Sequence, residues 1–197
     1  MELIFASNNK HKIEETKAIV RDAFTITSLS EAGIDIDIPE PHATIEANAT
    51  EKSTVIHNLL CKDCFSEDTG LEVEALNGEP GVLSARYAGE NKSAEKNIEK
   101  LLFNLQGVEN RNAQFKTVIS LILKGKEYTF EGICKGTILA YTRGKEGFGY
   151  DPVFLPTGST KTLAEMNMQE KNTFSHRKNA LTRMIAFLNH QKTIKTN

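Results

Sequence analysis

Residues 3–20 read LIFASNNKHKIEETKAIV, and this stretch decides which class of fold the chain adopts. The short apolar run Leu3–Ala6 is typical of a buried strand. Apolar residues then recur at helical spacing over 13–20, so the polar segment between the two predicts a loop and a helix start capped by Ser7 or Asn9. A strand that leads directly into a helix is the repeating unit of mixed α/β folds, which is the fold class we expect.

Further helices and strands follow the same logic along the chain. Turn residues between two runs rich in β-branched and aromatic side chains indicate a hairpin, and Thr162-x-x-Glu165 is a candidate capping box for a short helix. We expect helices from about Thr44 to Leu60, from Ala94 to Leu105 and from Ser175 onward, a hairpin between Gln114–Leu123 and Tyr128–Leu139, and a frayed polar tail over 191–197.

The size and charge of the chain limit what it binds. Its 197 residues suffice for one compact domain or for two lobes that share a sheet. The 24 basic and 26 acidic side chains nearly cancel, whereas a protein held on a nucleic acid polymer needs a basic excess. No apolar run is long enough to span a membrane, and residues 1–3 do not resemble a signal peptide.

Three cysteines bear on the cellular compartment. Cys61 and Cys64 form a CxxC pair, but no second pair of ligands follows at the spacing of a zinc site. We therefore interpret them as free thiols where a helix meets a strand. Such thiols are typical of the reducing cytoplasm.

Four segments carry candidate chemistry, and the first is the loop Ser7–Lys12. A helix N-terminus offers unpaired N–H groups and a positive dipole end, which suit a phosphate group. Lys10 and Lys12 would add positive charge. Many loops of this kind bind nothing, so the segment taken alone favours an ordinary structural loop.

The second segment is acidic and runs from Ser66 to Leu71. Glu67 and Asp68 close a predicted strand that we expect to turn at Gly70. Neighbouring side chains of a strand point to opposite faces, so only one of the two carboxylates enters a given site. Mg²⁺ prefers such oxygen ligands together with substrate phosphates. The alternative is a solvated acidic turn.

The third and fourth segments lie near the C-terminal end. In Glu146–Pro152, glycines on both sides of Phe148 would let the backbone approach a flat ligand while the ring stacks on it; the alternative is a turn with core aromatics. In Glu170–Arg177, His176 and Arg177 fall in the first turn of the last predicted helix. There they could donate hydrogen bonds to carbonyl or phosphate oxygens, or they could simply be exposed.

Taken together and in order, these segments resemble the family of non-canonical purine nucleoside-triphosphate pyrophosphatases, also called inosine triphosphate pyrophosphatases. The matching stretches are SNNKHK (7–12), EDTGLEVEALNGEPGVLSARYAG (67–89), GFGYDPVF (147–154) and AEMNMQEKNTFSHR (164–177). Three departures stand out. Asn8 replaces a glycine and would tolerate a left-handed backbone, Glu67 replaces an aspartate, and the segment at Glu40 differs from the family pattern.

The resemblance implies an elongated mixed sheet in two lobes with helices around it, a central nucleotide-binding cleft and a homodimer. It implies hydrolysis of ITP, dITP or XTP to the monophosphate and pyrophosphate with Mg²⁺. Asp68 would be the general base and a metal ligand, with Glu40 as the second ligand. The residues implied in substrate binding are Ser7, Asn8, Asn9, Lys10, His11 and Lys12 at the phosphates, Lys52, Thr69 and Lys171 at the phosphates or sugar, and Phe148, Gly149, Tyr150, Asp151, His176 and Arg177 at the base.

The implied chemistry agrees with physical expectation. A dication and several lysines would neutralise the triphosphate, and such a reaction needs no covalent nucleophile. Donors from His176 and Arg177 would pair with the 6-oxo group of hypoxanthine or xanthine but not with the 6-amino group of adenine. Two alternatives remain at this point: a Maf-like pyrophosphatase with another base preference, and a nucleotide-binding regulator without turnover.

Overall fold

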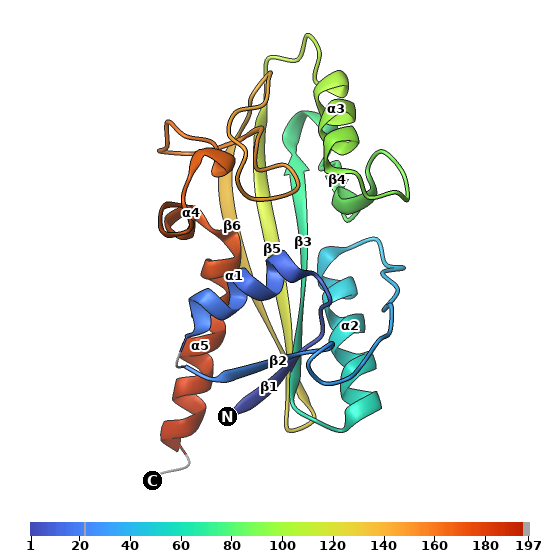
Figure 1. Ribbon diagram of the computed structural model, residues 1–197, viewed down its shortest axis with the longest axis vertical. Helices are drawn as coiled ribbons and strands as arrows, with labels where there is room; N and C mark the ends of the chain where they lie inside the picture. The colour runs from blue at the N-terminus through green and yellow to red at the C-terminus, as the bar shows by residue number, and fades with distance from the viewer. Residues whose placement is uncertain (22, 195–197) are drawn as a thin grey trace. The chain divides into compact units, whose positions relative to one another are not determined.

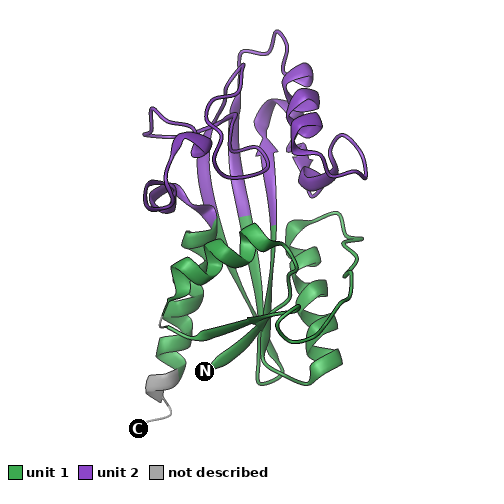
Figure 2. Cartoon of the chain, in the orientation of Figure 1, with its two compact units in different colours: residues 1–68, 117–132, 177–197 green, residues 69–116, 133–176 purple. Residues whose placement is uncertain are grey.

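The computed structural model describes residues 1–21 and 23–194, and these divide into two compact units (Figure 2). Unit 1 comprises 1–68, 117–132 and 177–197, and unit 2 comprises 69–116 and 133–176. Each unit has its own apolar core. The prediction that 1–197 form a single domain stays a prediction.

Unit 1 is a layered α/β structure (Figure 1). Strand β1 pairs in parallel with β2 on one side and with the start of β3 on the other, and the order β2-β1-β3-β5-β6 continues through a hairpin. The elements that contribute to it are β1 (Glu2–Phe5), α1 (Lys10–Val20), β2 (Thr25–Ser28), α2 (Ile45–Leu60), β3 (Cys64–Val73), β5 (Asn112–Leu123), β6 (Lys126–Ile138) and α5 (His176–Ile194).

Side-chain alternation along the strands sorts the helices of unit 1 onto two faces of its sheet. Odd-numbered residues of β1, β3 and β5, such as Phe5, Phe65 and Leu121, pack in one cluster with apolar residues of α1 and α5. Even-numbered residues of the same strands, such as Ile4 and Cys64, pack in a separate cluster with Ile56 of α2. The parity of a residue in β3 therefore decides which helices it meets.

Local sequence signals produce the ends of these elements. The side chain of Asn9 caps α1 by accepting from the Lys12 N–H at 3.2 Å, and Thr44 caps α2 in the same way. Lys124 and Gly125 both have positive φ, as a two-residue hairpin between β5 and β6 requires. The predicted cap at Asn9, the predicted helix start near Thr44 and the predicted hairpin are thus confirmed.

Unit 2 is built on the remaining parts of β3, β5 and β6 (Figure 1). The end of β3 pairs with β4 and the end of β6 pairs with β7, both antiparallel. Its further elements are the 3₁₀ helices η1 (Glu74–Leu76), η2 (Ser84–Arg86) and η3 (Leu163–Glu165), the strands β4 (Pro80–Gly81) and β7 (Phe154–Pro156), and the helices α3 (Ala94–Asn104) and α4 (Met168–Phe174). The predicted capping box at Thr162 and Glu165 is confirmed at η3.

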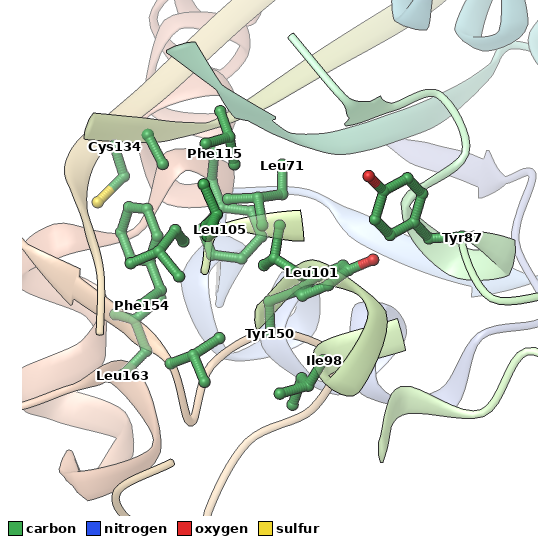
Figure 3. Packing of buried hydrophobic residues seen from close by; sticks show 14 of the residues in the cluster. Leu71, Tyr87, Ile98, Leu101, Leu105, Phe115, Cys134, Tyr150, Phe154 and Leu163 are labelled. Atoms are coloured by element: carbon green, nitrogen blue, oxygen red, sulfur yellow. The ribbon is translucent and has the colours of Figure 1, made fainter. Parts of the chain in front are cut away.

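The core of unit 2 gathers aromatic and aliphatic side chains from strands and from α3 (Figure 3). Leu101 and Leu105 of the α3 region pack with Leu71 of β3 and with Phe154 of β7. Tyr150 joins this core, and its hydroxyl donates to the Ser84 carbonyl oxygen at 2.9 Å. The loop that carries Tyr150 is therefore anchored in the core of its unit.

Three sequence expectations are corrected here. The strand at Glu67 and Asp68 does not turn at Gly70 but continues to Val73, because Leu71 and Val73 are fully buried in the core of unit 2. Helix α5 begins at His176 rather than Ser175, since Ser175 is the C-terminal residue that caps α4. The part of the expected tail at 191–194 continues α5, and 195–197 lie outside the described residues.

The predicted mixed α/β class, with helices around a mixed sheet, is confirmed. Within the described residues, no helix is long and apolar enough to cross a membrane. Cys61 is exposed at the end of α2 and Cys64 is buried at the start of β3, so the free thiols lie at the helix-to-strand junction, as expected.

Candidate active site

The loop 7–9 joins β1 to α1 in unit 1 and leaves the first turn of α1 accessible. Asn8 to His11 are exposed, and the Ser7 hydroxyl accepts from the Asn9 N–H at 3.2 Å. Lys12 is half-buried, and its Nζ lies 3.3 Å from Glu67 Oε1. The Lys12 N–H is capped by the Asn9 side chain, but the positive end of the helix dipole and the nearby lysines suit this region to an anion.

Asn8 stabilises this loop by a route that the sequence did not predict. Its φ is not positive, so the expected left-handed backbone does not occur. Instead, its side-chain amide donates to the Ile36 carbonyl oxygen at 3.2 Å. The asparagine therefore links the loop to the segment that leads towards Glu40.

Two carboxylates of unit 1 meet at one lysine. Lys52, on the buried face of α2, donates from Nζ to Glu40 Oε1 at 2.7 Å and to Asp68 Oδ1 at 2.9 Å. The side chains of Lys52 and Asp68 are less than a tenth exposed, and that of Glu40 is 29% exposed. We call these three residues the carboxylate–lysine clamp. The sequence had left the place of Glu40 uncertain, and the structure puts it beside Asp68.

Burial and charge both act on the clamp. Burial raises the pKa of Asp68, and the neighbouring Glu40 carboxylate adds to this, against the opposing charges of Lys52 and Lys12. Burial alone would lower the pKa of Lys52, but the charges of Asp68 and Glu40 raise it above its ordinary value. Lys52 therefore stays charged, and Asp68 has the raised proton affinity of a group suited to accept a proton.

Glu67 and Asp68 have different partners, as the alternation of β3 requires. The Glu67 carboxylate takes a bidentate pair from Arg177, with Nε to Oε2 at 2.7 Å and Nη2 to Oε1 at 2.9 Å. The third nitrogen of Arg177, Nη1, is hydrogen-bonded to Glu15 of α1. Burial alone would lower the pKa of Arg177, but the charges of Glu67 and Glu15 raise this pKa above its ordinary value.

This buried network bears on the predicted role of Arg177. Its side chain is 1% exposed, and all three guanidinium nitrogens are held by carboxylates of unit 1. Three of its five N–H groups are engaged by these carboxylates, and the enclosed guanidinium presents almost no surface to a nucleobase. Its base-reading role stays a prediction. Glu15 was not foreseen, and the only local signal for it is its spacing of three residues from Lys12 on one helix face.

Unit 2 brings together Phe148 and Asp151, which were predicted near the base, and Lys171, which was predicted at the phosphates or sugar. The Asp151 carboxylate accepts from the Phe148 N–H at 2.9 Å and from Lys171 Nζ at 2.8 Å through the same oxygen, Oδ2. Lys171 Nζ lies 5.0 Å from the centroid of the half-buried Phe148 ring. Asp151 thus fixes both the turn that carries the ring and the ammonium group beside it.

The other predicted residues of unit 2 fall into two groups. His176 is buried, and its ring stacks on Phe115 with centroids 4.9 Å apart. Tyr150 is a core residue, whereas Thr69 and Gly149 are half-buried. Their roles in substrate binding stay predictions. A surface hollow of about 810 Å³ in this unit lies at α3 and is lined by none of the predicted site residues.

The comparisons with known proteins cover nearly the whole chain. The sequence profile of the Ham1 family matches residues 3–187. A dITP/XTP pyrophosphatase of Flavobacterium johnsoniae is 50% identical over 192 residues, which is 98% of this chain and 100% of that protein. The structure of the Staphylococcus aureus Ham1 protein superposes with a TM-score of 0.88 at 44% sequence identity. The match covers 97% of this chain and 100% of the Staphylococcus aureus chain.

A third comparison comes from a more distant relative. The crystal structure of the nucleoside-triphosphatase, or dITP/XTP pyrophosphatase, of Mycobacterium abscessus is 36% identical, with a TM-score of 0.77. The match covers 93% of this chain and 98% of the Mycobacterium abscessus chain. At this identity and coverage, the likeness extends to the sequence as well as to the fold.

The buried Arg177 network makes a prediction about stability. Arg177→Ala leaves Glu67 and Glu15 buried without their shared cation, so we expect unfolding in urea to show a loss of about 3–5 kcal/mol. Arg183→Ala serves as the control, because Arg183 is an exposed arginine of the same helix; it should change stability by less than about 0.5 kcal/mol. Equal effects of the two substitutions would contradict the account of this network.

The turn at Phe148 provides a second prediction. Gly147 has φ +78°, and a Cβ there would lie 2.2 Å from Asp151 Oδ2; Gly149 has φ +61°, and a Cβ there would meet no atom within 4 Å. Gly149→Ala should cost about 1–2 kcal/mol through its left-handed backbone alone. Gly147→Ala should cost at least about 1 kcal/mol more, because Asp151 must also leave its two donors. Thermal unfolding of the pair measures the difference, and equal losses would show that Asp151 does not hold the turn.

Proposed function

This chain belongs to the Ham1 family, and from that premise we propose that it uses Mg²⁺ to hydrolyse dITP, XTP and ITP. It is a hydrolase that converts non-canonical purine nucleoside triphosphates to the monophosphate and pyrophosphate. The main observation in favour of a metal-dependent reaction is that Glu40 and Asp68 lie together in the carboxylate–lysine clamp.

The donor set of the clamp fits magnesium. Mg²⁺ is bound through one or two carboxylates together with substrate phosphates and water, rather than by a cage made only of protein. The described residues hold no group of three or more acidic, histidine or cysteine side chains that could form such a cage. Glu40 and Asp68 would therefore hold the ion, which when bound neutralises triphosphate charge.

The residues of unit 1 account for the phosphate chemistry. The first turn of α1, with Lys10 and Lys12, would bind the triphosphate through N–H groups and positive charge. Asp68 accepts a proton from the water whose oxygen attacks the α-phosphorus. The bond between the α-phosphorus and the bridging oxygen then breaks, and pyrophosphate leaves with that oxygen and its electron pair. The position of the buried Asp68 carboxylate, beside Glu40 in the clamp, supports this role.

The residues of unit 2 account for recognition of the base. The Phe148 ring offers a stacking surface, and the Lys171 ammonium, a donor-only group, lies over that ring at 5.0 Å from its centroid. A base stacked on Phe148 would place a 6-oxo group, as in hypoxanthine or xanthine, next to a donor, whereas adenine would present its amino group there. Lys171 was expected at the phosphates or sugar, and its position favours the base instead.

The remaining features of the proposal rest on the resemblance. We include the homodimer because it is the usual assembly of the family. We include the cytoplasm because three free cysteines suit a reducing compartment.

A substrate panel tests the function directly. We expect release of pyrophosphate from dITP, XTP and ITP with Mg²⁺, with ATP slower by about 5- to 150-fold for each buried donor left unpaired. Chelation with EDTA should abolish the activity, and excess Mg²⁺ should restore it. Full activity in EDTA would refute the metal requirement, and equal rates for ATP and ITP would refute the base assignment. Binding of ITP without any pyrophosphate release would identify a regulator without turnover.

The role of Asp68 has its own test. Asp68→Asn keeps the shape of the side chain but removes its proton-accepting charge, so the rate of pyrophosphate release should fall by at least about 100-fold. Glu72→Gln is the matched control, because Glu72 lies on the same strand but pairs with Gln114 in unit 2. Circular dichroism should show both variants folded. Activity of Asp68→Asn within a few-fold of the wild type would remove Asp68 from the mechanism.

A further inference from the structure

Lys52 occupies the position that a metal ion would need. Its ammonium contacts one oxygen of Glu40 at 2.7 Å and one of Asp68 at 2.9 Å, so it lies between the two carboxylates that the proposed function assigns to Mg²⁺. The Lys52 side chain is 8% exposed, and solvent screens its charge little. In this arrangement the lysine is the counter-ion of both carboxylates.

A dication bound to the remaining oxygens of Glu40 and Asp68 would lie close to this ammonium. Mg²⁺ binds carboxylate oxygens at about 2.0–2.1 Å, which would bring two like-charged groups to within a few ångström of each other in a buried place. Repulsion between the two cations therefore favours transfer of the ammonium to another anion. A lysine side chain has a flexible four-carbon stem and can follow such an anion without movement of its helix.

The proposed anion site belongs to the same unit. Asn8, in the loop that leads into α1, donates to the Ile36 carbonyl oxygen at 3.2 Å, in the segment that leads to Glu40. This contact holds the proposed phosphate-binding loop next to the segment that carries Glu40 of the clamp. A triphosphate bound there would offer Lys52 new oxygens at the moment the metal ion takes the old ones.

We propose that Lys52 is an exchangeable counter-ion, which holds Glu40 and Asp68 together in the nucleotide-free protein and transfers to the triphosphate when the metal binds. This inference rests on the proposed metal-dependent function. It means that Lys52 competes with the metal in the free protein but supports the metal–triphosphate complex. Metal and triphosphate thus bind together, and each strengthens the other by the same factor, commonly about 5- to 150-fold.

The test is metal binding measured apart from activity. Mn²⁺ serves as the probe, and free Mn²⁺ is followed by electron paramagnetic resonance in the nucleotide-free protein. Lys52→Met should bind Mn²⁺ at least about tenfold more tightly than the wild type, because the competing ammonium is gone. Lys62→Met, which removes an exposed lysine just after α2, should bind Mn²⁺ as the wild type does. The double variant with Glu40→Gln and Lys52→Met should lose the tighter Mn²⁺ binding of Lys52→Met, because one of the two carboxylates is then absent.

The second arm adds the non-hydrolysable α,β-methylene analogue of dITP. In the wild type this analogue should tighten Mn²⁺ binding, whereas in Lys52→Met the tightening should shrink by at least about fivefold. A Lys52→Met protein that binds Mn²⁺ no better than the wild type, or more weakly, overturns the proposal. So does an unchanged effect of the analogue.

Folding of the variant is controlled in the same experiment. Loss of Lys52 leaves two neighbouring carboxylates without their cation, so Mn²⁺ should raise the melting temperature of Lys52→Met more than that of the wild type. Lys52→Gln, which keeps a polar side chain, should behave like Lys52→Met. If Mn²⁺ raised the melting temperature of both variants only as much as that of the wild type, the proposal would also be overturned. Pyrophosphate release by the wild type with Mg²⁺ is measured separately, so failure of the proposed function is distinguished from failure of this inference.

Discussion

The alternation of side chains along β3 is the constraint on which the candidate site depends. Because consecutive residues of a strand face opposite ways, Glu67 meets α1 and α5 while Asp68 meets α2. Each carboxylate is buried and has a buried cation of its own, Arg177 for one and Lys52 for the other. A shift of one residue in β3 would exchange the two carboxylates and leave both cations wrongly paired.

The two pairs differ in a way that suits different tasks. Arg177 is fully enclosed, and its planar fork matches Glu67 with two hydrogen bonds, so this pair joins α5 to β3 and through Glu15 to α1. The Lys52 ammonium makes single contacts to two carboxylates, one of them on the partly exposed Glu40. A point charge on a flexible stem can be exchanged, whereas a bidentate fork is costly to break. The Arg177 pair on one face of β3 therefore suits stability, and the Lys52 pair on the other face suits the proposed chemistry.

Local signals in the sequence were sufficient for much of the fold. The N-cap at Asn9, the start of α2 near Thr44, the hairpin at Lys124 and the amphipathic α3 each depend on a few neighbouring residues, and all were predicted. The continuation of β3 beyond Gly70 was missed, since it depends on burial in the core of unit 2. The motif resemblance indicated which residues matter, but not their contacts: the Arg177–Glu67 pair joins residues 110 positions apart, and no local pattern encodes it.

The most direct test of the central claim, that Asp68 directs water to the α-phosphorus, is the fate of the water oxygen. Hydrolysis of dITP in water enriched in ¹⁸O, followed by mass spectrometry of both products, shows which phosphorus was attacked. The account predicts the heavy oxygen in the monophosphate and unlabelled pyrophosphate. Label in the pyrophosphate would mean attack at the β-phosphorus, and would contradict the placement of water and base around Asp68.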